Sequence, residues 1–353
     1  MNHEPMRTPA AETNPFLYRF AWFTAAATVL LICSGGMVTS KGVGLAVPDW
    51  PTTFGYNMFF FPVSKWVGGI FFEHTHRLIA SLIGFLTIIL AVCLWRTRTE
   101  GWIKTLGWLS LGAVVLQGVL GGLRVTLLKD EIGIFHACLA QAFLGLLVVI
   151  ALALSPIWTR IGRSGLAVPS RGLAIVAMII SGLIYGQLAL GATMRHQHRD
   201  LSITDFPLAY GQIISATDPA TIARINQVRD AQALSDVSAG QIWLQMVHRF
   251  VALIIGLTIG TFWFLVRQKE RLTAALRKLA NLWLGLVLMQ ITLGAWTIWS
   301  NKAADIATAH VAVGAITFAT GIVITALLLR LRHVAGRSVG APSEIQLAEA
   351  TAS

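Results

Sequence analysis

Long apolar runs separated by short polar segments dominate the pattern of the chain. A helix needs about 20 apolar residues to cross a bilayer, and eight segments of this sequence qualify. They lie near residues 17–39, 74–95, 104–123, 132–154, 172–193, 243–266, 279–299 and 306–330. Runs of this length exclude a closed barrel, the one alternative that hydrocarbon allows. The pattern therefore predicts an all-α integral membrane protein with eight transmembrane helices.

Composition and charge support this prediction and add an orientation. The 353 residues are 55% hydrophobic and 12% charged, with a mean hydropathy of +0.69. If both termini lie on one face, that face collects 16 Lys and Arg against 6 Asp and Glu, and the other collects 11 against 10. The positive-inside rule then predicts a multi-pass protein of the inner (cytoplasmic) membrane with both termini in the cytoplasm. The basic clusters are orientation signals, so the formal charge of +11 does not indicate nucleic-acid binding.

An internal repeat divides the chain. Residues 35–55, GGMVTSKGVGLAVPDWPTTFG, align without a gap to residues 191–211, GATMRHQHRDLSITDFPLAYG. Both share the order Asp, aromatic, Pro, two residues, aromatic, Gly. The alignment continues through three further matches: HRLIASLIG at 76–84 with HRFVALIIG at 248–256, QGVLGG at 117–122 with QITLGA at 290–295, and His136 with His310. We therefore expect two copies of a four-helix unit, related by a pseudo-twofold axis along the membrane normal.

The repeat sets the expected domain boundaries. The four-helix bundles occupy residues 17–160 and 161–333, between cytoplasmic tails at 1–16 and 334–353. An insertion at 212–240 lengthens the second outer loop, because 37 residues separate Gly211 from His248 where 21 separate Gly55 from His76. We interpret this polar, partly helical insertion as an outer cap.

Four histidines occupy matching places near the starts of even-numbered spans: His76, His136, His248 and His310. With both termini inside, every even span starts at the outer face, so all four lie at one depth, two in each bundle. Ionisable groups inside a membrane span indicate a functional site. Two neutral imidazoles from separate helices of one bundle can bind heme iron from its two faces. A non-heme metal and structural hydrogen bonding are the alternatives, and zinc is disfavoured because two histidines under-fill its coordination shell.

Charged and polar neighbours refine these sites. Arg77 and Arg249 each follow a candidate ligand, where a guanidinium can bind heme propionates or extend to the membrane interface. His74 lies two residues from His76 and therefore points away from the same iron, so we interpret it as an interfacial residue. The three cysteines lie inside predicted spans with no spaced partner and are expected to pack rather than to form a disulfide or bind metal.

The two halves differ beside the second and sixth spans. Glu73 lies three residues before His76, on the same helix face, and the equivalent residue before His248 is Gln245. A carboxylate can take a proton or stabilise a developing cation, which an amide of the same shape cannot do. We infer that the first bundle performs chemistry and the second holds a permanent cofactor. The alternative is that Glu73 only marks the water boundary at a helix N-terminus.

These residues resemble the heme A synthase family. The resemblance rests on E-x-x-H-R at 73–77, His136, H-R at 248–249 and His310, with the outer-loop motifs GLAVPDWPTTFG and DLSITDFPLAYG, and covers roughly residues 17–330. It implies oxidation of the methyl group at ring position 8 of heme O to a formyl group, giving heme A for cytochrome oxidase assembly. It also implies heme b as a resident cofactor, and heme O synthase, cytochrome oxidase assembly factors, membrane lipid and a further copy of the chain as partners.

The resemblance also implies roles for single residues. His248 and His310 bind heme b, His76 and His136 face the substrate heme, and Glu73 is the functionally required glutamate. Many members carry a cysteine pair in the first outer loop, whereas residues 40–72 contain no cysteine, so no thiol-dependent step is expected there. A diheme b-type electron-transfer protein and a heme transporter are the competing classes. A prenyltransferase that makes heme O is disfavoured, because no aspartate-rich diphosphate motif occurs in any loop.

Overall fold

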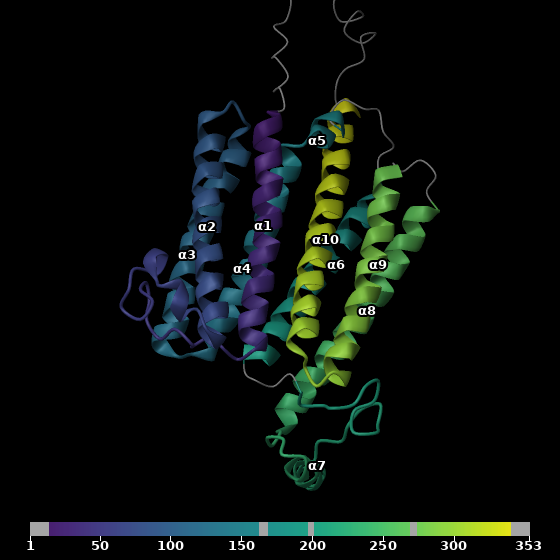
Figure 1. Ribbon diagram of the computed structural model, residues 1–353. Coiled ribbons are helices and arrows are strands. Elements are labelled where there is room, and N and C mark those ends of the chain that lie inside the picture. The colour runs from purple at the N-terminus through teal and green to yellow at the C-terminus, as the bar shows by residue number, and fades with distance from the viewer. Residues whose placement is uncertain (1–13, 162–168, 197–200, 269–273, 340–353) are drawn as a thin grey trace, which may run out of the picture.

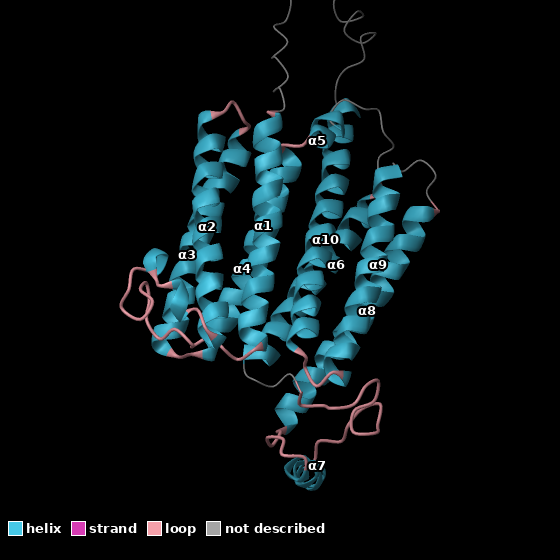
Figure 2. Ribbon diagram, in the orientation of Figure 1, coloured by secondary structure: helices cyan, strands magenta, loops and turns pink. Residues whose placement is uncertain are grey.

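The computed structural model describes residues 14–161, 169–196, 201–268 and 274–339. Helices dominate the described residues, and no strand occurs among them (Figure 2). The long helices are α1 Pro15–Ser40, α2 Gly68–Arg96, α3 Gly101–Leu127, α4 Asp130–Ala153, α6 Arg171–His196, α8 Ala239–Arg267, α9 Ala274–Trp299 and α10 Ala304–Val339. All eight are long and apolar enough to cross a membrane. The eight predicted transmembrane helices are therefore confirmed.

Several helices begin earlier than their apolar runs. α2 begins at Gly68, six residues before the predicted start at residue 74, and the added residues are GGIFFE. A helix satisfies its own backbone hydrogen bonds in water as well as in lipid, so its end need not coincide with the edge of the hydrocarbon. Two helices begin with common N-terminal capping motifs. Asn14 accepts hydrogen bonds from the first turn of α1, and Ser238 and Gln241 form a capping box on α8.

Shorter helices lie between the long ones. α5 Pro156–Ile161 follows α4, and the 3₁₀ turns η1 Met58–Phe60 and η2 Val63–Lys65 lie in the first outer loop; none of these was predicted. α7 Pro219–Ala231 lies in the predicted insertion, whose partly helical character is confirmed. Of the predicted tails at 1–16 and 334–353, residues 1–13 and 340–353 lie outside the described residues, while α1 begins at Pro15 and α10 continues to Val339.

The eight long helices form two closed rings of contacts. In the first ring α1 and α3 each contact both α2 and α4, and in the second α8 and α10 each contact both α6 and α9. Helices α1, α4, α6 and α10 make the contacts that join the rings (Figure 1). The ring memberships match the two predicted four-helix units, while the twofold relation between them stays a prediction.

Each ring has its own hydrophobic core. The first core includes the fully buried Leu90, Leu144 and Ile150, and the second surrounds Trp283, whose indole packs edge-on against Phe262 with the ring centroids 5.5 Å apart. Large apolar side chains remain exposed on the outward helix faces. In a membrane protein these faces lie against lipid tails, so exposed apolar side chains there need no protein partner.

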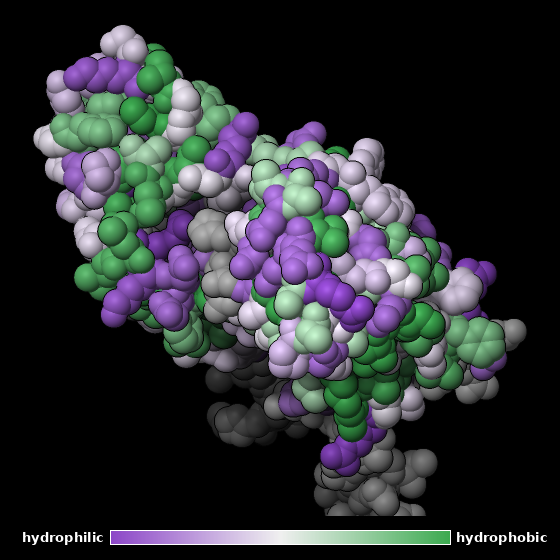
Figure 3. Space-filling model, turned by 90° about the horizontal axis from the view of Figure 1, so that it is seen from below, coloured by the Kyte–Doolittle hydropathy of each residue, from purple (hydrophilic) through white to green (hydrophobic). Residues whose placement is uncertain are grey.

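The long loops and the cap lie at one end of the helices. α1 begins and α10 ends at the opposite end (Figure 1). The cap has a small core made of Ile203, Ala209, Ile225, Val237, Ile242 and Met246. The buried Arg229 of α7 supports it by donating hydrogen bonds to the carbonyls of Ser235 and Leu201. Viewed from this end, hydrophilic residues gather over the middle of the face (Figure 3).

Candidate functional site

The four candidate histidines come together as two pairs. His76 of α2 is close enough to His136 of α4 for charges on the two rings to interact, and the same holds for His248 of α8 and His310 of α10. In the first ring α3 contacts both α2 and α4, and in the second ring α9 contacts both α8 and α10. The histidines of each pair therefore approach the middle of one ring from two sides.

Each imidazole packs against a glycine of an adjoining helix. The contacts join Gly35 to His76, Gly121 to His136, Gly191 to His248 and Gly294 to His310. A Cβ built on these glycines would lie 2.9 to 3.5 Å from the Cε1 atom of the histidine. Contacts below about 3.4 Å require the neighbour to move, so in three of the four cases glycine is the residue that lets the ring lie where it does. All four glycines lie in the aligned repeat segments, so the repeat itself was a signal for them.

The histidines also have buried nitrogen atoms without partners. The Nδ1 atom of all four is buried with no partner in hydrogen-bonding geometry among the described residues. An unsatisfied buried polar atom costs about 1–3 kcal/mol and needs an explanation. The backbone of two of these histidines does have side-chain partners on neighbouring helices. Gln117 Nε2 donates to the carbonyl of His136 at 3.1 Å, and Gln187 Nε2 donates to the carbonyl of His248 at 2.8 Å.

This geometry can be compared with the requirements of two metal groups. Heme iron accepts two axial imidazoles from facing helices, which fits one histidine pair in each ring. Structural zinc requires four protein ligands, and no group of three or more His, Cys, Asp or Glu suited to a metal ion occurs in the described part of the chain. The residues fit heme and do not fit zinc.

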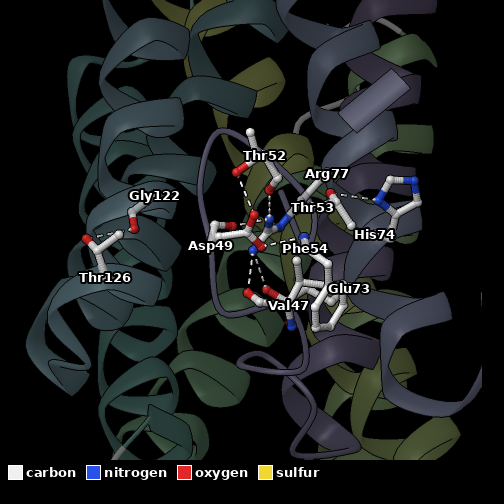
Figure 4. A network of polar contacts seen from close by, with 10 residues as sticks. All are labelled: Val47, Asp49, Thr52, Thr53, Phe54, Glu73, His74, Arg77, Gly122 and Thr126. Carbon is white, nitrogen blue, oxygen red and sulfur yellow. Dashed lines mark hydrogen bonds and ion pairs between the residues drawn. The ribbon is translucent and has the colours of Figure 1, made fainter. Parts of the chain in front are cut away.

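Glu73 is buried beneath the first outer loop. Its side chain is in the second turn of α2, and the residue is 4% exposed. Oε2 accepts a hydrogen bond from the Val47 N–H at 2.8 Å, and Oε1 forms an ion pair with Nη2 of Arg77 at 2.9 Å (Figure 4). The alternative that Glu73 marks the water boundary at a helix N-terminus is therefore wrong, because the helix begins earlier and the loop covers the carboxylate.

Gln245 makes the equivalent contact in the second half. Its Oε1 accepts a hydrogen bond from the Ile203 N–H at 2.7 Å, and its Nε2 donates to the Ile203 carbonyl at 3.1 Å. The repeat alignment places Ile203 opposite Val47. Both halves therefore tether the same loop position to the helix that carries a histidine. What distinguishes Glu73 is its charge and not the contact.

Arg77 binds loop carbonyls. Its Nη1 donates to the carbonyls of Asp49 at 2.7 Å and Thr52 at 3.1 Å, and its Nη2 donates to that of Val47 at 2.8 Å (Figure 4). Together with the Glu73 ion pair, these contacts use both terminal nitrogens of the guanidinium. Arg77 thus fastens the first outer loop to α2, a role that the sequence analysis missed.

Arg249 makes the matching contacts in the second half. Its Nη2 donates to the Asp205 carbonyl and its Nη1 to the Leu208 carbonyl, both at 2.8 Å. Its guanidinium also lies over the Phe206 ring, 5.5 Å from the centroid. Binding of heme propionates by Arg77 and Arg249 stays a prediction, and any such contact would add to these loop contacts.

The two outer loops share one turn. The Asp49 carboxylate accepts hydrogen bonds from the N–H groups of Phe54 at 2.7 Å and Gly55 at 2.9 Å, and Asp205 accepts the same pair from Tyr210 and Gly211. Burial acts to raise the pKa of Asp49, but the hydrogen bonds from Gly55, Thr52 and Phe54 outweigh it, so the pKa lies below its ordinary value. The glycines have φ of 75° and 78°, which explains why the motif ends in glycine.

His74 does not have the interfacial position predicted for it. It is 0% exposed, its Nδ1 lies 3.3 Å from the Thr53 hydroxyl, and its ring packs against Phe61 and Trp66 with centroids 5.1 and 4.7 Å away. The first outer loop folds over this side of α2 and buries it. His74 therefore supports the loop. The three cysteines are not paired with one another and are partly buried.

Arg124 was also missed. It lies in the last turn of α3, within electrostatic range of Glu73, His76 and His136. It directly follows the predicted span 104–123, where a basic side chain ordinarily extends to the membrane interface, so the sequence marks it only as one of the positive charges on the outer face.

The fold and its histidines define a class: a polytopic membrane protein whose two helical rings each present a histidine pair suited to heme. The comparison with known families agrees, because the model of the cytochrome oxidase assembly protein family (COX15-CtaA) matches residues 56–322. The chain belongs to this family.

Individual relatives extend the similarity over most of the chain. The chain is 24% identical over 294 residues to the heme A synthase of Shouchella clausii, covering 81% of this chain and 88% of the relative. It is 23% identical over 322 residues to that of Alkalihalophilus pseudofirmus, covering 89% and 98%. It is 31% identical over 241 residues to that of Beijerinckia indica, covering 65% and 62%.

Proposed function

We propose that this protein is a heme A synthase, which oxidises the methyl group at ring position 8 of heme O to a formyl group. The reaction takes place in the first ring, between His76 and His136, and a resident heme b lies between His248 and His310 in the second. The observation that carries the proposal is one asymmetry in chemistry between two sites of similar architecture. Both have a histidine pair packed on glycines, but only the first has a carboxylate, Glu73, where the second has Gln245.

The side chains of the first ring have separate roles in this proposal. Bound heme supplies redox chemistry that no side chain of the chain can supply. His76 and His136 hold the substrate heme from its two faces and so orient its edge. Glu73, one turn before His76, holds a negative charge at a fixed place because Val47 and Arg77 bind its two oxygens. A carboxylate there can stabilise positive charge or accept a proton as the methyl group is oxidised.

The position of the sites suits an amphiphilic substrate. An isoprenoid-tailed heme has carboxylates that favour the polar boundary and a tail that favours lipid. The histidines lie toward the loop-bearing end of the helices, below polar loops and beside apolar outer faces. We infer that this end faces outward and that both termini are cytoplasmic, in the inner membrane, with heme O synthase and oxidase assembly factors as partners.

Extraction of heme from the purified full-length protein tests the proposal. We expect heme b together with heme O or heme A, identified by chromatography and by pyridine hemochrome spectra. The resident heme b accounts for one component, and substrate or product accounts for the other. Heme b alone at about two equivalents per chain would contradict the proposal and favour a diheme electron-transfer protein, in which both pairs hold the same cofactor.

The glycine contacts give a matched pair of variants. A Cβ on Gly35 would lie 2.9 Å from His76, whereas a Cβ on the equivalent Gly191 would lie 3.5 Å from His248, which is an ordinary contact. Overpacking costs about 1–3 kcal/mol, so Gly35→Ala is expected to weaken heme binding in the first ring by about 5- to 100-fold. Gly191→Ala is expected to leave heme b in place. Spectroscopic titration with heme measures both, and equal effects of the two substitutions would contradict the role assigned to Gly35.

A further inference from the structure

Arg124 lies in a space that two glycines leave open. Its Nη1 would be 2.7 Å from a Cβ on Gly44 of the first outer loop, and its Nε would be 3.0 Å from one on Gly133 of α4. A larger residue at Gly44 would displace the guanidinium, and one at Gly133 would displace first the His196 ring, whose Nδ1 would lie 2.5 Å from the Cβ, and then Nε of Arg124. The side chain is half-buried at the loop-bearing end of the first ring. The fold thus keeps a charged group between a loop and two helices, close to the candidate site.

The guanidinium has no acceptor within the described part of the chain. Arg77 and Arg249, by contrast, donate to loop carbonyls. Arg195 donates to the Gly36 carbonyl and the Ser40 hydroxyl. Arg124 makes no such hydrogen bond to another described residue, although a guanidinium carries five N–H donors in a planar fork. It is therefore the arginine near the histidine pairs whose donors are available to a ligand.

The charges around Arg124 favour an anion. The carboxylate of Glu73 is already paired with Arg77 at 2.9 Å, and the other carboxylate within electrostatic range, Asp130, is exposed to solvent. Solvent screens such an exposed charge. His76 and His136 are also within range of Arg124 and add no negative charge. The first site therefore has one cation without a buried counterion.

The second half has no arginine at the repeat-equivalent position; the arginine close enough to interact with His310 is Arg195, which already donates to Gly36 and Ser40. The register that aligns Gln117 with Gln290 places Thr297 opposite Arg124. The Thr297 hydroxyl donates to the Leu293 carbonyl of its own helix at 2.9 Å. Arg124 is thus specific to the half that carries Glu73, the half to which the substrate is assigned.

We propose that Arg124 binds a propionate carboxylate of the heme in the first ring and so orients that heme between His76 and His136. This inference rests on the proposed function, because it requires a heme at the first histidine pair. A planar guanidinium can hold a carboxylate through two parallel N–H bonds, which constrains the rotation of the porphyrin as well as its position. A fixed rotation brings one chosen methyl group of the ring to Glu73. Arg124 is therefore a positioning residue for the substrate.

Heme binding to the full-length protein in detergent tests this inference. The probes are iron protoporphyrin IX and its dimethyl ester, whose carboxylates are blocked, and the readout is the affinity measured from the Soret band. His76→Ala identifies the binding event of the first ring. We expect the unmodified protein to bind the diacid about 10- to 100-fold more tightly than the ester, since a hydrogen bond to a charged group contributes about 1.5–3 kcal/mol.

Three substitutions test whether Arg124 itself binds the carboxylate. Arg124→Gln is expected to abolish the preference for the diacid while leaving ester affinity within about threefold, and Arg124→Lys, which keeps the charge, to retain part of the preference. Arg224→Gln removes a charge from the exposed cap and is expected to change neither affinity.

Three results would overturn the inference or its basis. An unchanged diacid preference in Arg124→Gln would show that another group binds the carboxylate. Equal weakening of both probes would assign Arg124 a purely structural role. If the unmodified protein bound neither probe in a His76-dependent manner, the proposed function itself would fail, and this inference with it.

Discussion

Replacing Glu73 with glutamine is expected to reduce the conversion of heme O to heme A by at least about 100-fold, the usual contribution of a positioned acid or base. The outer loop should stay in place, because Gln245 already makes the same hydrogen bond with an amide, to the Ile203 N–H at 2.7 Å. The substitution therefore removes the charge and its ion pair with Arg77 but preserves the acceptor for the Val47 N–H, and Arg77 keeps its three loop carbonyls. Product formation in membranes supplied with heme O, measured by heme chromatography, gives the rate.

Two further variants separate charge from contact. Glu73→Ala removes the acceptor of the Val47 N–H and is expected to loosen the loop as well as to stop the reaction, which limited proteolysis of the loop would detect. Gln245→Glu puts a carboxylate oxygen where the Gln245 amide donates to the Ile203 carbonyl at 3.1 Å, so it is expected to loosen the second outer loop and not to raise the rate. Heme content measured on each preparation serves as the control for folding.

The same experiment separates the enzyme from a heme transporter. A transporter uses the histidines without chemistry, so loss of the Glu73 charge would leave its flux of heme nearly unchanged. Full activity of Glu73→Gln, with normal heme content, would remove the main argument for catalysis in the first ring. The asymmetry between Glu73 and Gln245 would then have no chemical meaning.

Replacing a single histidine is expected to empty one site and spare the other. His310→Ala should lower the content of resident heme b by at least about tenfold, since changes around a metal ligand already cost 10- to 100-fold in affinity. His136→Ala should instead abolish binding of the substrate heme and leave heme b in place. The two pairs lie in different rings, each with most of its core made by its own helices, so a change in one pair is not expected to disturb the other. Absorption spectra of the purified variants, with heme extraction, measure both sites.

His74 provides the control for this experiment. It is a buried histidine two residues from His76, but it packs beneath the loop against Phe61 and Trp66. His74→Phe keeps an aromatic ring in that space and is expected to retain heme in both rings. Loss of both hemes from His136→Ala and from His310→Ala alike would contradict two independent sites and would indicate one shared site or a general loss of folding.

The sequence alone determined the number of membrane spans, the family and the candidate site residues. Hydrocarbon imposes a minimum length on apolar helices, so eight spans could be counted without knowledge of their packing. The repeat selected His76 over His74 and placed Glu73 opposite Gln245, because equivalent positions of a duplicated unit have equivalent surroundings. The family assignment followed from the same residues and agrees with the matched family model.

Only the tertiary structure decided what these residues contact. His74 was predicted to be interfacial, and a boundary position was the alternative for Glu73 and Arg77. The fold instead places all three against a loop, whose backbone supplies partners for Glu73 and Arg77. Backbone carbonyl and N–H groups occur along the whole chain, so the pattern of side chains cannot predict which of them will bind Glu73 or Arg77. The open donors of Arg124 likewise became visible only when the loop and α4 were placed around it. Span length and repeat register are local properties of a chain, whereas the pairing of buried polar groups depends on how distant segments meet.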